Sequence, residues 1–104
     1  MTNILKLMQA AKKMEKSVKE TDEKLRNTQV TGSAGPNNCV SIETNGQHIC
    51  TKVELGPETK NLSNDELAQA ILNAINQTNE KIKELSKTEF SQIADLIASE
   101  TKDS

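Results

Sequence analysis

The sequence predicts an α+β fold, with a long N-terminal helix, a three-stranded antiparallel sheet and a C-terminal helix or helix pair. Three observations support this order. The first 26 residues carry an apolar heptad pattern, the middle of the chain alternates with a period of two, and the last third returns to helical spacing. The 104 residues fit a single domain, which we divide into a helical arm (1–27), a sheet (28–56) and a C-terminal helical region (62–100).

The first helix is predicted from an apolar residue at every third or fourth position. About three heptads have their a and d positions filled by Ile4, Leu7, Ala11, Met14, Val18, Thr21 and Leu25. The segment contains no Gly or Pro and is rich in good helix formers. A narrow apolar stripe on a long helix needs a partner. We therefore expect a core or dimer seam that includes Ile4, Leu7, Met14, Val18 and Leu25.

Basic residues gather on the opposite side of this helix. Residues 1–26 hold seven basic and four acidic residues, whereas the rest of the chain is acidic and brings the net charge to −2. The b, c and f positions of the heptads carry Lys6, Lys12, Lys13, Lys16, Lys19 and Arg26. Such a stripe is typical of a surface that follows DNA phosphates. The pattern alone favours a second interpretation, a solvated helix face with pairs such as Glu15–Lys19, Glu20–Lys24 and Asp22–Arg26.

The middle of the chain is predicted to form strands. Residues 28–31 are a short strand candidate, and residues 32–38 form a loop by composition. Val40, Ile42 and Thr44 then alternate with polar residues, which indicates a strand with one apolar face.

The dipeptide Asn45-Gly46 predicts how the second and third strands pair. It is the strongest short signal for a two-residue type I′ turn, because both central residues of that turn need a positive φ. This turn places Ile42 opposite Ile49, and a shift by one residue would turn polar side chains toward the core. We therefore expect Ile42, Ile49 and Val53 to belong to the core or dimer seam.

The C-terminal region is predicted to be helical. Ser63 and Glu66 have the spacing of a capping box, and Leu62 before them can pack on Leu67. One helical face then carries Leu67, Ile71, Ile75, Thr78, Ile82 and Leu85. Ser86 and Glu89 have the spacing to cap a further helix, so the sequence leaves open one bent helix or two.

Catalytic, cofactor and membrane functions are not indicated. The single histidine has no nucleophile arranged with it, and no phosphate-binding glycine loop occurs. Cys39, His48 and Cys50 share a sheet face in the expected register, but structural zinc needs four ligands and no C-x-x-C pair is present. No apolar run approaches the roughly 20 residues of a membrane helix. We expect a cytoplasmic protein with free thiols, no enzyme activity, no cofactor, no metal and no small-molecule substrate.

Three short segments, taken together, resemble the YbaB/EbfC family of nucleoid-associated proteins. They are residues 8–14 (MQAAKKM), residues 30–35 (VTGSAG) and, most clearly, residues 45–55 (NGQHICTKVEL). The resemblance covers roughly residues 3–90. Gly56-Pro57 departs from the Asp-Pro of many relatives, and the C-terminal part lacks the Gly/Pro/Met-rich tail of some members. The resemblance implies an α+β fold, a tweezer-like homodimer and binding of duplex DNA with low sequence preference. It also implies a nucleoid location, effects on transcription and no catalysis.

The composition limits how DNA is held. The chain has one aromatic residue, Phe90, and one arginine, Arg26, so it lacks a stacking platform for single strands and bidentate contacts to guanine. The chain can therefore hold duplex DNA only through its phosphates and recognise only its shape. The alternative function is a coiled-coil protein-interaction or chaperone-like module, built as helix, hairpin and helix like a prefoldin subunit, without DNA binding.

Overall fold

The computed structural model describes residues 3–101 and confirms the predicted α+β order. Its main elements are α1 (Ile4–Arg26), β1 (Gln29–Ala34), β2 (Val40–Asn45), β3 (Cys50–Leu55) and α2 (Asn64–Thr101). Two short 3₁₀ turns, Pro36–Asn38 and Pro57–Asn61, lie in the connections. The strands form one antiparallel sheet in the order β1-β2-β3.

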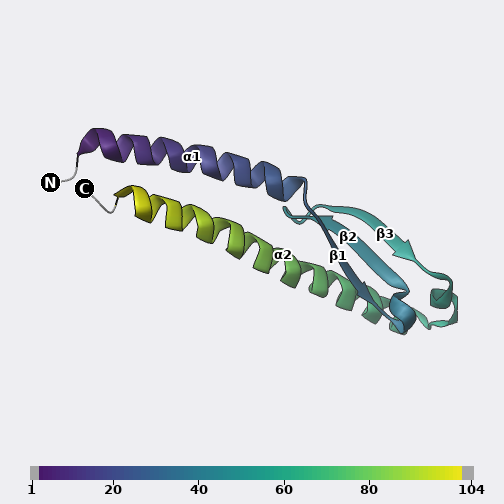
Figure 1. The fold of residues 1–104 in the computed structure, drawn as a ribbon. Coiled ribbons are helices and arrows are strands. Elements are labelled where there is room, and N and C mark those ends of the chain that lie inside the picture. The colour runs from purple at the N-terminus through teal and green to yellow at the C-terminus, as the bar shows by residue number, and fades with distance from the viewer. Residues whose placement is uncertain (1–2, 102–104) are drawn as a thin grey trace.

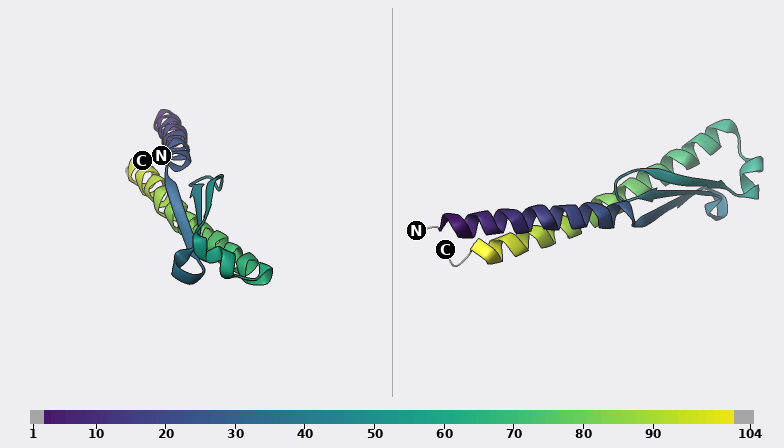
Figure 2. Two further views of the ribbon diagram at one scale, coloured as in Figure 1. Left: turned by 90° about the vertical axis from the view of Figure 1, so that its right-hand side faces the viewer. Right: turned by 90° about the horizontal axis from the view of Figure 1, so that it is seen from above.

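The molecule is elongated. Its extents are 68 × 18 × 17 Å, and its radius of gyration is 20.0 Å, whereas a compact chain of this length would have about 13 Å. The sheet packs on the N-terminal half of α2, and α1 runs beside the C-terminal half of α2 (Figure 1, Figure 2). The two helices therefore extend beyond the sheet as an arm.

Local capping explains where α1 begins and ends. The Asn3 side chain accepts a hydrogen bond of 2.9 Å from the backbone N–H of Leu5, as N-caps do. Near the last turn, the Thr28 hydroxyl donates to the carbonyl of Lys24 at 2.6 Å. The face turned to α2 buries Ala10, Thr21 and Leu25.

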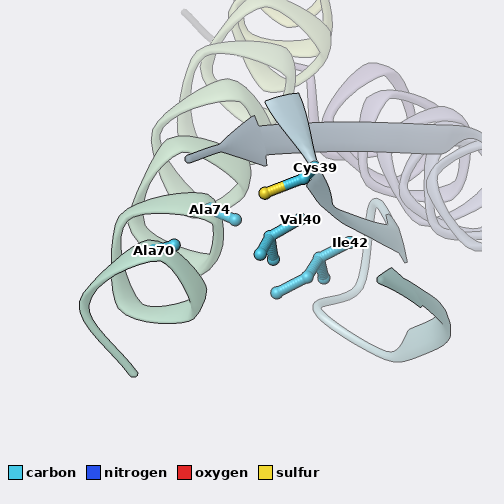
Figure 3. Close-up of a cluster of buried hydrophobic side chains, with 5 residues drawn as sticks. All are labelled: Cys39, Val40, Ile42, Ala70 and Ala74. Carbon is cyan, nitrogen blue, oxygen red and sulfur yellow. The ribbon is translucent and has the colours of Figure 1, made fainter. Parts of the chain in front are cut away.

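The core lies between the sheet and α2. Cys39, Val40 and Ile42 point toward Ala70 and Ala74 of α2 (Figure 3). The buried stripe of α2 continues through Thr78 and Ile82. The alternation predicted for β2 is confirmed, since Val40, Ile42 and Thr44 are all buried.

The stripe on α2 differs from the predicted one. Thr78 and Ile82 are buried as expected, but Ile75 is 41% exposed, and the small residues Ala70 and Ala74 occupy the sheet-facing positions instead. The reason is the close approach of helix and sheet. At Gly32 an added Cβ would collide with the Thr78 hydroxyl and the Ala74 carbonyl, so no side chain fits between the two layers at this position.

The helix α2 is one continuous helix, which settles the alternative that the sequence left open. It starts with the predicted capping box, in which the Ser63 N–H donates to Glu66 and the Glu66 N–H donates to Ser63, each at 3.1 Å. It passes through Ser86 without a break, and the Thr88 hydroxyl bonds back to the Glu84 carbonyl at 3.0 Å. Within residues 3–101, no helix combines the length and apolar character needed to cross a membrane.

The predicted end of the first strand was wrong. β1 does not stop before Gly32 but continues to Ala34, with Gly32 paired to Ile42. Gly32 lies within the strand at a point where α2 comes too close for a side chain, and the chain does not turn there. The turn comes at Gly35, which has a φ of 83°.

The predicted hairpin register was also wrong. Ile42 lies opposite Val53, not Ile49. The loop has three residues, Gly46 to His48, and His48 takes the left-handed conformation with a φ of 64°. A left-handed residue at the last position is common in three-residue hairpin loops. A bulge at Thr51 then completes the shift in register.

Two contacts favour this loop over the expected one. The Asn45 side chain accepts hydrogen bonds from the backbone N–H groups of Gln47 and Ile49, at 2.9 and 3.1 Å. The Gly46 N–H donates to the Leu25 carbonyl at the end of α1, at 2.7 Å. The second contact is tertiary, so a local sequence signal does not reveal it.

Candidate nucleic-acid interface

The candidate interface is the arm, which we define as α1 together with the C-terminal half of α2. The two helices run in opposite directions side by side (Figure 1). Near the sheet they are joined by an ion pair of 2.8 Å between Lys24 Nζ and Glu89 Oε1. The Glu89 side chain is only 11% exposed, so this ion pair joins α1 to α2 at a largely shielded carboxylate.

The predicted cationic stripe lies on the outside of the arm. Lys12, Lys13, Lys16, Lys19 and Arg26 are exposed, and Lys6 is half-buried. Because the buried residues of α1 lie on its other side, these cations point to solvent along most of the helix. The structure thus places the six residues on one helix face, which is the geometry that a linear polyanion requires.

The three ion pairs expected for a merely solvated helix face do not form among residues 3–101, and one other pair, Lys16–Glu20, is present. Among residues 3–101, neither Glu15–Lys19 nor Asp22–Arg26 makes an ion pair, and Lys24 binds Glu89 in place of Glu20. Lys16 and Glu20 lie 3.9 Å apart with side chains 79% and 66% exposed. A pair this long and this exposed contributes little. It leaves Lys16 able to bind an anion.

Two exposed lysines of α2, Lys83 and Lys87, were not among the predicted site residues. Their spacing of four residues places them on the same side of α2. They were not predicted because the C-terminal half of the chain is acidic, with Glu80, Glu84 and Glu89 in the same helical turns.

The predicted apolar seam divides into buried and exposed members. Leu25 and Ile42 are buried, and Val18 is half-buried. The other five, at 45–72% exposure, are Ile4, Leu7, Met14, Ile49 and Val53. Three of these are on the arm, where Met14 and Val18 face Phe90 and Ile93 across an apolar groove of about 490 Å³. The other two are on or beside β3.

The structure does not bring Cys39, His48 and Cys50 together. Cys39 is buried in the core beside α2, whereas Cys50 is exposed on β3. The His48 ring lies in the hairpin loop with Nδ1 at 3.3 Å from Asn79 Oδ1. No group of metal-binding side chains occurs in the described part of the chain.

One charged pair lies on the sheet rather than the arm. Lys52 Nζ is 2.6 Å from Glu54 Oε1. This hydrogen bond raises the pKa of Lys52 above its ordinary value, and the negative charges of Glu54 and Glu43 raise it further. Lys52 is therefore a firmly charged residue on the outer face of the sheet.

The sequence is similar to known proteins over most of its length. A family model described as the YbaB/EbfC DNA-binding family matches residues 1–97. A nucleoid-associated protein of Xanthomonas campestris pv. campestris (strain B100) is 38% identical over 86 residues, covering 82% of this chain and 78% of the relative. A nucleoid-associated protein of Xylella fastidiosa (strain Temecula1 / ATCC 700964) is 36% identical over 85 residues, covering 79% of each.

The fold also matches a solved structure. The crystal structure of an uncharacterized protein from Helicobacter pylori superimposes with a TM-score of 0.80, covering 90% of this chain and 99% of the other. The sequences are 17% identical, so the match concerns the fold alone.

Proposed function

We propose that this chain, which belongs to the YbaB/EbfC DNA-binding family, is a nucleoid-associated protein that holds duplex DNA by its phosphates. It does so with low sequence specificity, as a cytoplasmic homodimer located on the nucleoid, where it affects transcription. The names of its relatives, as nucleoid-associated proteins, support the location and the partner. We propose no enzyme activity for this protein.

The observation that carries the proposal is the exposed cationic face of α1. From Lys6 to Arg26 the stripe is about 30 Å long, at 1.5 Å per residue, close to the roughly 34 Å of one turn of duplex DNA. Lysines spaced along such a length displace condensed counterions from successive phosphates. The ion pair between Lys24 and Glu89 joins α1 to α2 near the end of this stripe.

The same residues account for low specificity. Lysines hold phosphates as point charges, and only one stripe residue, Arg26, has the forked guanidinium that reads guanine. Phosphate contacts position a protein on a duplex without reading its sequence. Any preference then comes from the width and bending of the DNA.

A homodimer explains the exposed part of the apolar seam. Large apolar residues such as Ile4, Met14 and Val53 are uncovered in the single chain, and small domains are commonly stabilised by sharing such surface. A dimer also carries two arms on one body. Two linked arms raise the apparent affinity for one duplex without any further contact.

The test is fluorescence anisotropy of a labelled duplex of mixed sequence at several salt concentrations, with the fold checked by circular dichroism. We expect saturable binding whose log K falls linearly with log salt, by about 0.9 for each phosphate contact. The same affinity for unrelated sequences is expected. A folded protein that does not bind duplex DNA even at low salt would contradict the proposal.

The second candidate function is a coiled-coil protein-interaction or chaperone-like module. The apolar groove of the arm favours it, because Met14, Val18 and Phe90 offer a partner helix an apolar seat. This function predicts binding of an amphipathic helix that persists at high salt, with no affinity for DNA. The anisotropy experiment therefore separates the two functions.

A further inference from the structure

The cationic stripe of α1 becomes apolar at the end of the helix that lies far from the sheet (Figure 1). The b positions of the heptads are occupied in turn by Leu5, Lys12, Lys19 and Arg26. Leu5 is therefore in line with three cations, and it is 67% exposed. Met8 lies four residues before Lys12, on the same side of the helix, and is 53% exposed. The outward face of α1 thus carries cations over most of its length and apolar side chains at this end.

Neither the core nor the apolar seam accounts for these two residues. The side of α1 that packs on α2 buries Ala10, Thr21 and Leu25. With about 3.6 residues per turn, Leu5 lies about 140° from Ala10 around the helix, and Met8 about 160°. Both side chains are therefore directed away from α2 and into solvent, where a large apolar group is not expected unless something binds it.

This end of α1 can also approach a polyanion closely. Lys6, Lys12 and Lys13 all precede Glu15, which is the first acidic residue in the sequence. A polyanion that follows the stripe is therefore not repelled by acidic side chains of α1 at this end. Leu5 lies about 10 Å beyond Lys12 along the helix axis. That distance is enough to pass from a row of phosphates into the neighbouring minor groove, which is about 6 Å wide.

Two kinds of anionic surface attract cations together with apolar side chains: a duplex and a membrane. A helix that lies on a membrane keeps its apolar residues on one face along its length and its cations on the opposite face. In α1, Leu5 and Met8 share a face with the cations and are separated from them along the helix instead. Proteins that bind the minor groove insert residues such as Leu, Ile and Met between base pairs, beside cations on the phosphates. The arrangement on α1 therefore favours duplex DNA.

We propose that Leu5 and Met8 form an apolar wedge that enters the minor groove of duplex DNA, opens a base step and bends the duplex. Lys12 and Lys19 hold phosphates beside the groove while the wedge is inserted. This inference rests on the proposed function and adds an apolar contact to the phosphate contacts expected from the composition. The wedge reads no base, but it favours steps that unstack easily, such as TA and CA.

The bend is measured by fluorescence resonance energy transfer between dyes at the two ends of a duplex of mixed sequence. With the duplex saturated by the unaltered protein, we expect a bend of about 20–90°, which raises the transfer. The double variant Leu5→Ala/Met8→Ala should keep α1 helical and should bind with the same dependence of log K on log salt, because it loses no cation. Its transfer should return to that of the free duplex.

Three single variants complete this test. Leu72→Ala removes a leucine that is 49% exposed on α2 but lies outside the arm, so it should leave the bend unchanged. Leu5→Phe keeps a large apolar side chain and should retain the bend, whereas Leu5→Ala should reduce it. Loss of the bend in Leu72→Ala, or an undiminished bend in Leu5→Ala/Met8→Ala, would overturn the wedge.

A duplex with a nick at its centre gives a second measurement, because base stacking is already weakened there. The unaltered protein should bind the nicked duplex several-fold more tightly than the intact one, since opening the step costs less free energy. Leu5→Ala/Met8→Ala should bind both duplexes alike. Equal affinity of the unaltered protein for the two duplexes would contradict the insertion.

Failure of the wedge is distinguishable from failure of the proposed function. A protein that holds DNA with the salt dependence of phosphate contacts but does not bend it overturns only the wedge. Co-sedimentation with phosphatidylserine vesicles that is lost in Leu5→Ala/Met8→Ala, with the DNA bend unaffected, assigns the two residues to a membrane surface instead. A folded protein that binds no duplex DNA even at low salt overturns the wedge and the proposed function together.

Discussion

Lys24 of α1 lies 2.8 Å from Glu89 of α2, and the glutamate side chain is 11% exposed whereas the lysine side chain is 60% exposed. The contact therefore joins the shielded carboxylate of Glu89 to the largely exposed ammonium group of Lys24. It joins the two helices of the arm near the point where they leave the sheet.

Replacement of Lys24 by Gln is expected to destabilise the fold by about 1–2 kcal/mol, because the shielded carboxylate loses its charged partner. Denaturant unfolding measures this loss. The double variant K24Q/E89Q should lose less than the sum of the two single variants, since no shielded charge is then left alone. Strict additivity would mean that the two side chains do not interact.

The capping box at the start of α2 predicts a dependence on pH. Hydrogen bonds from the Ser63 backbone, and next from its side chain, lower the pKa of Glu66 below its ordinary value of 4.5. A folded pKa below the unfolded one contributes stability that is present above the unfolded pKa and lost as the pH falls through the folded pKa. Stability should therefore fall on acidification below about pH 4.5.

Two variants separate this contribution from general acid denaturation. Ser63→Ala removes the cap and should cost about 1 kcal/mol at neutral pH, with a smaller further loss in acid. Glu66→Gln keeps an acceptor without a titrating charge and should also show less loss in acid. Unfolding curves at neutral pH and in acid measure both effects. If both variants lose as much stability in acid as the parent, the assignment to Glu66 is wrong.

The sequence predicted the elements that local physics controls. The Ser63–Glu66 box and the alternation along β2 need only neighbouring residues, and both are present. The cationic face of α1 follows from helical spacing, and the structure exposes most of its members. The contact of Lys24 with Glu89 was not predictable, because each residue also had nearer candidate partners along its own helix.

The errors occurred where tertiary contacts override local signals. Asn45-Gly46 predicted a two-residue turn, but the Gly46 N–H donates a hydrogen bond to the end of α1 and the loop has three residues. Large apolar side chains predicted the sheet-facing stripe of α2, yet Ala70 and Ala74 are buried on this face, and the helix approaches Gly32 closely at Ala74 and Thr78. Ile75 lies outside this close contact and is 41% exposed.

Gly32→Ala should be strongly destabilising. The added Cβ would meet the Thr78 hydroxyl and the backbone of α2, which cannot yield without moving the helix off the sheet. We expect a loss of about 2–3 kcal/mol, as for overpacked cores, measured by thermal or denaturant unfolding. Thr78→Ala in the same chain relieves one of the clashes and should recover part of the loss. A fully stable Gly32→Ala protein would contradict the close packing.

His48→Gly should stabilise the protein. His48 has a φ of 64°, a conformation that glycine adopts freely and other residues adopt at a cost of roughly 1–2 kcal/mol. Since the glycine also loses the exposed contact to Asn79, we expect a net gain of about 0.5–1 kcal/mol. Gln47→Gly, at the neighbouring position with negative φ, should bring no gain. A loss of stability in His48→Gly would show that the Asn79 contact outweighs the strain.

Reversal of the stripe lysines should abolish the salt-sensitive binding of DNA. The quadruple variant K12E/K13E/K16E/K19E replaces four cations of α1, which lowers the slope of log K against log salt by up to about 3–4 if each holds one phosphate. A single stripe reversal, Lys16→Glu, is compared with Lys60→Glu, which changes the net charge equally but lies in the Pro57–Asn61 turn beyond the sheet. Lys16→Glu should weaken binding several-fold more than Lys60→Glu. If the two single variants bind alike, or if the quadruple variant keeps its affinity with the fold and dimer intact, DNA binds elsewhere than on α1.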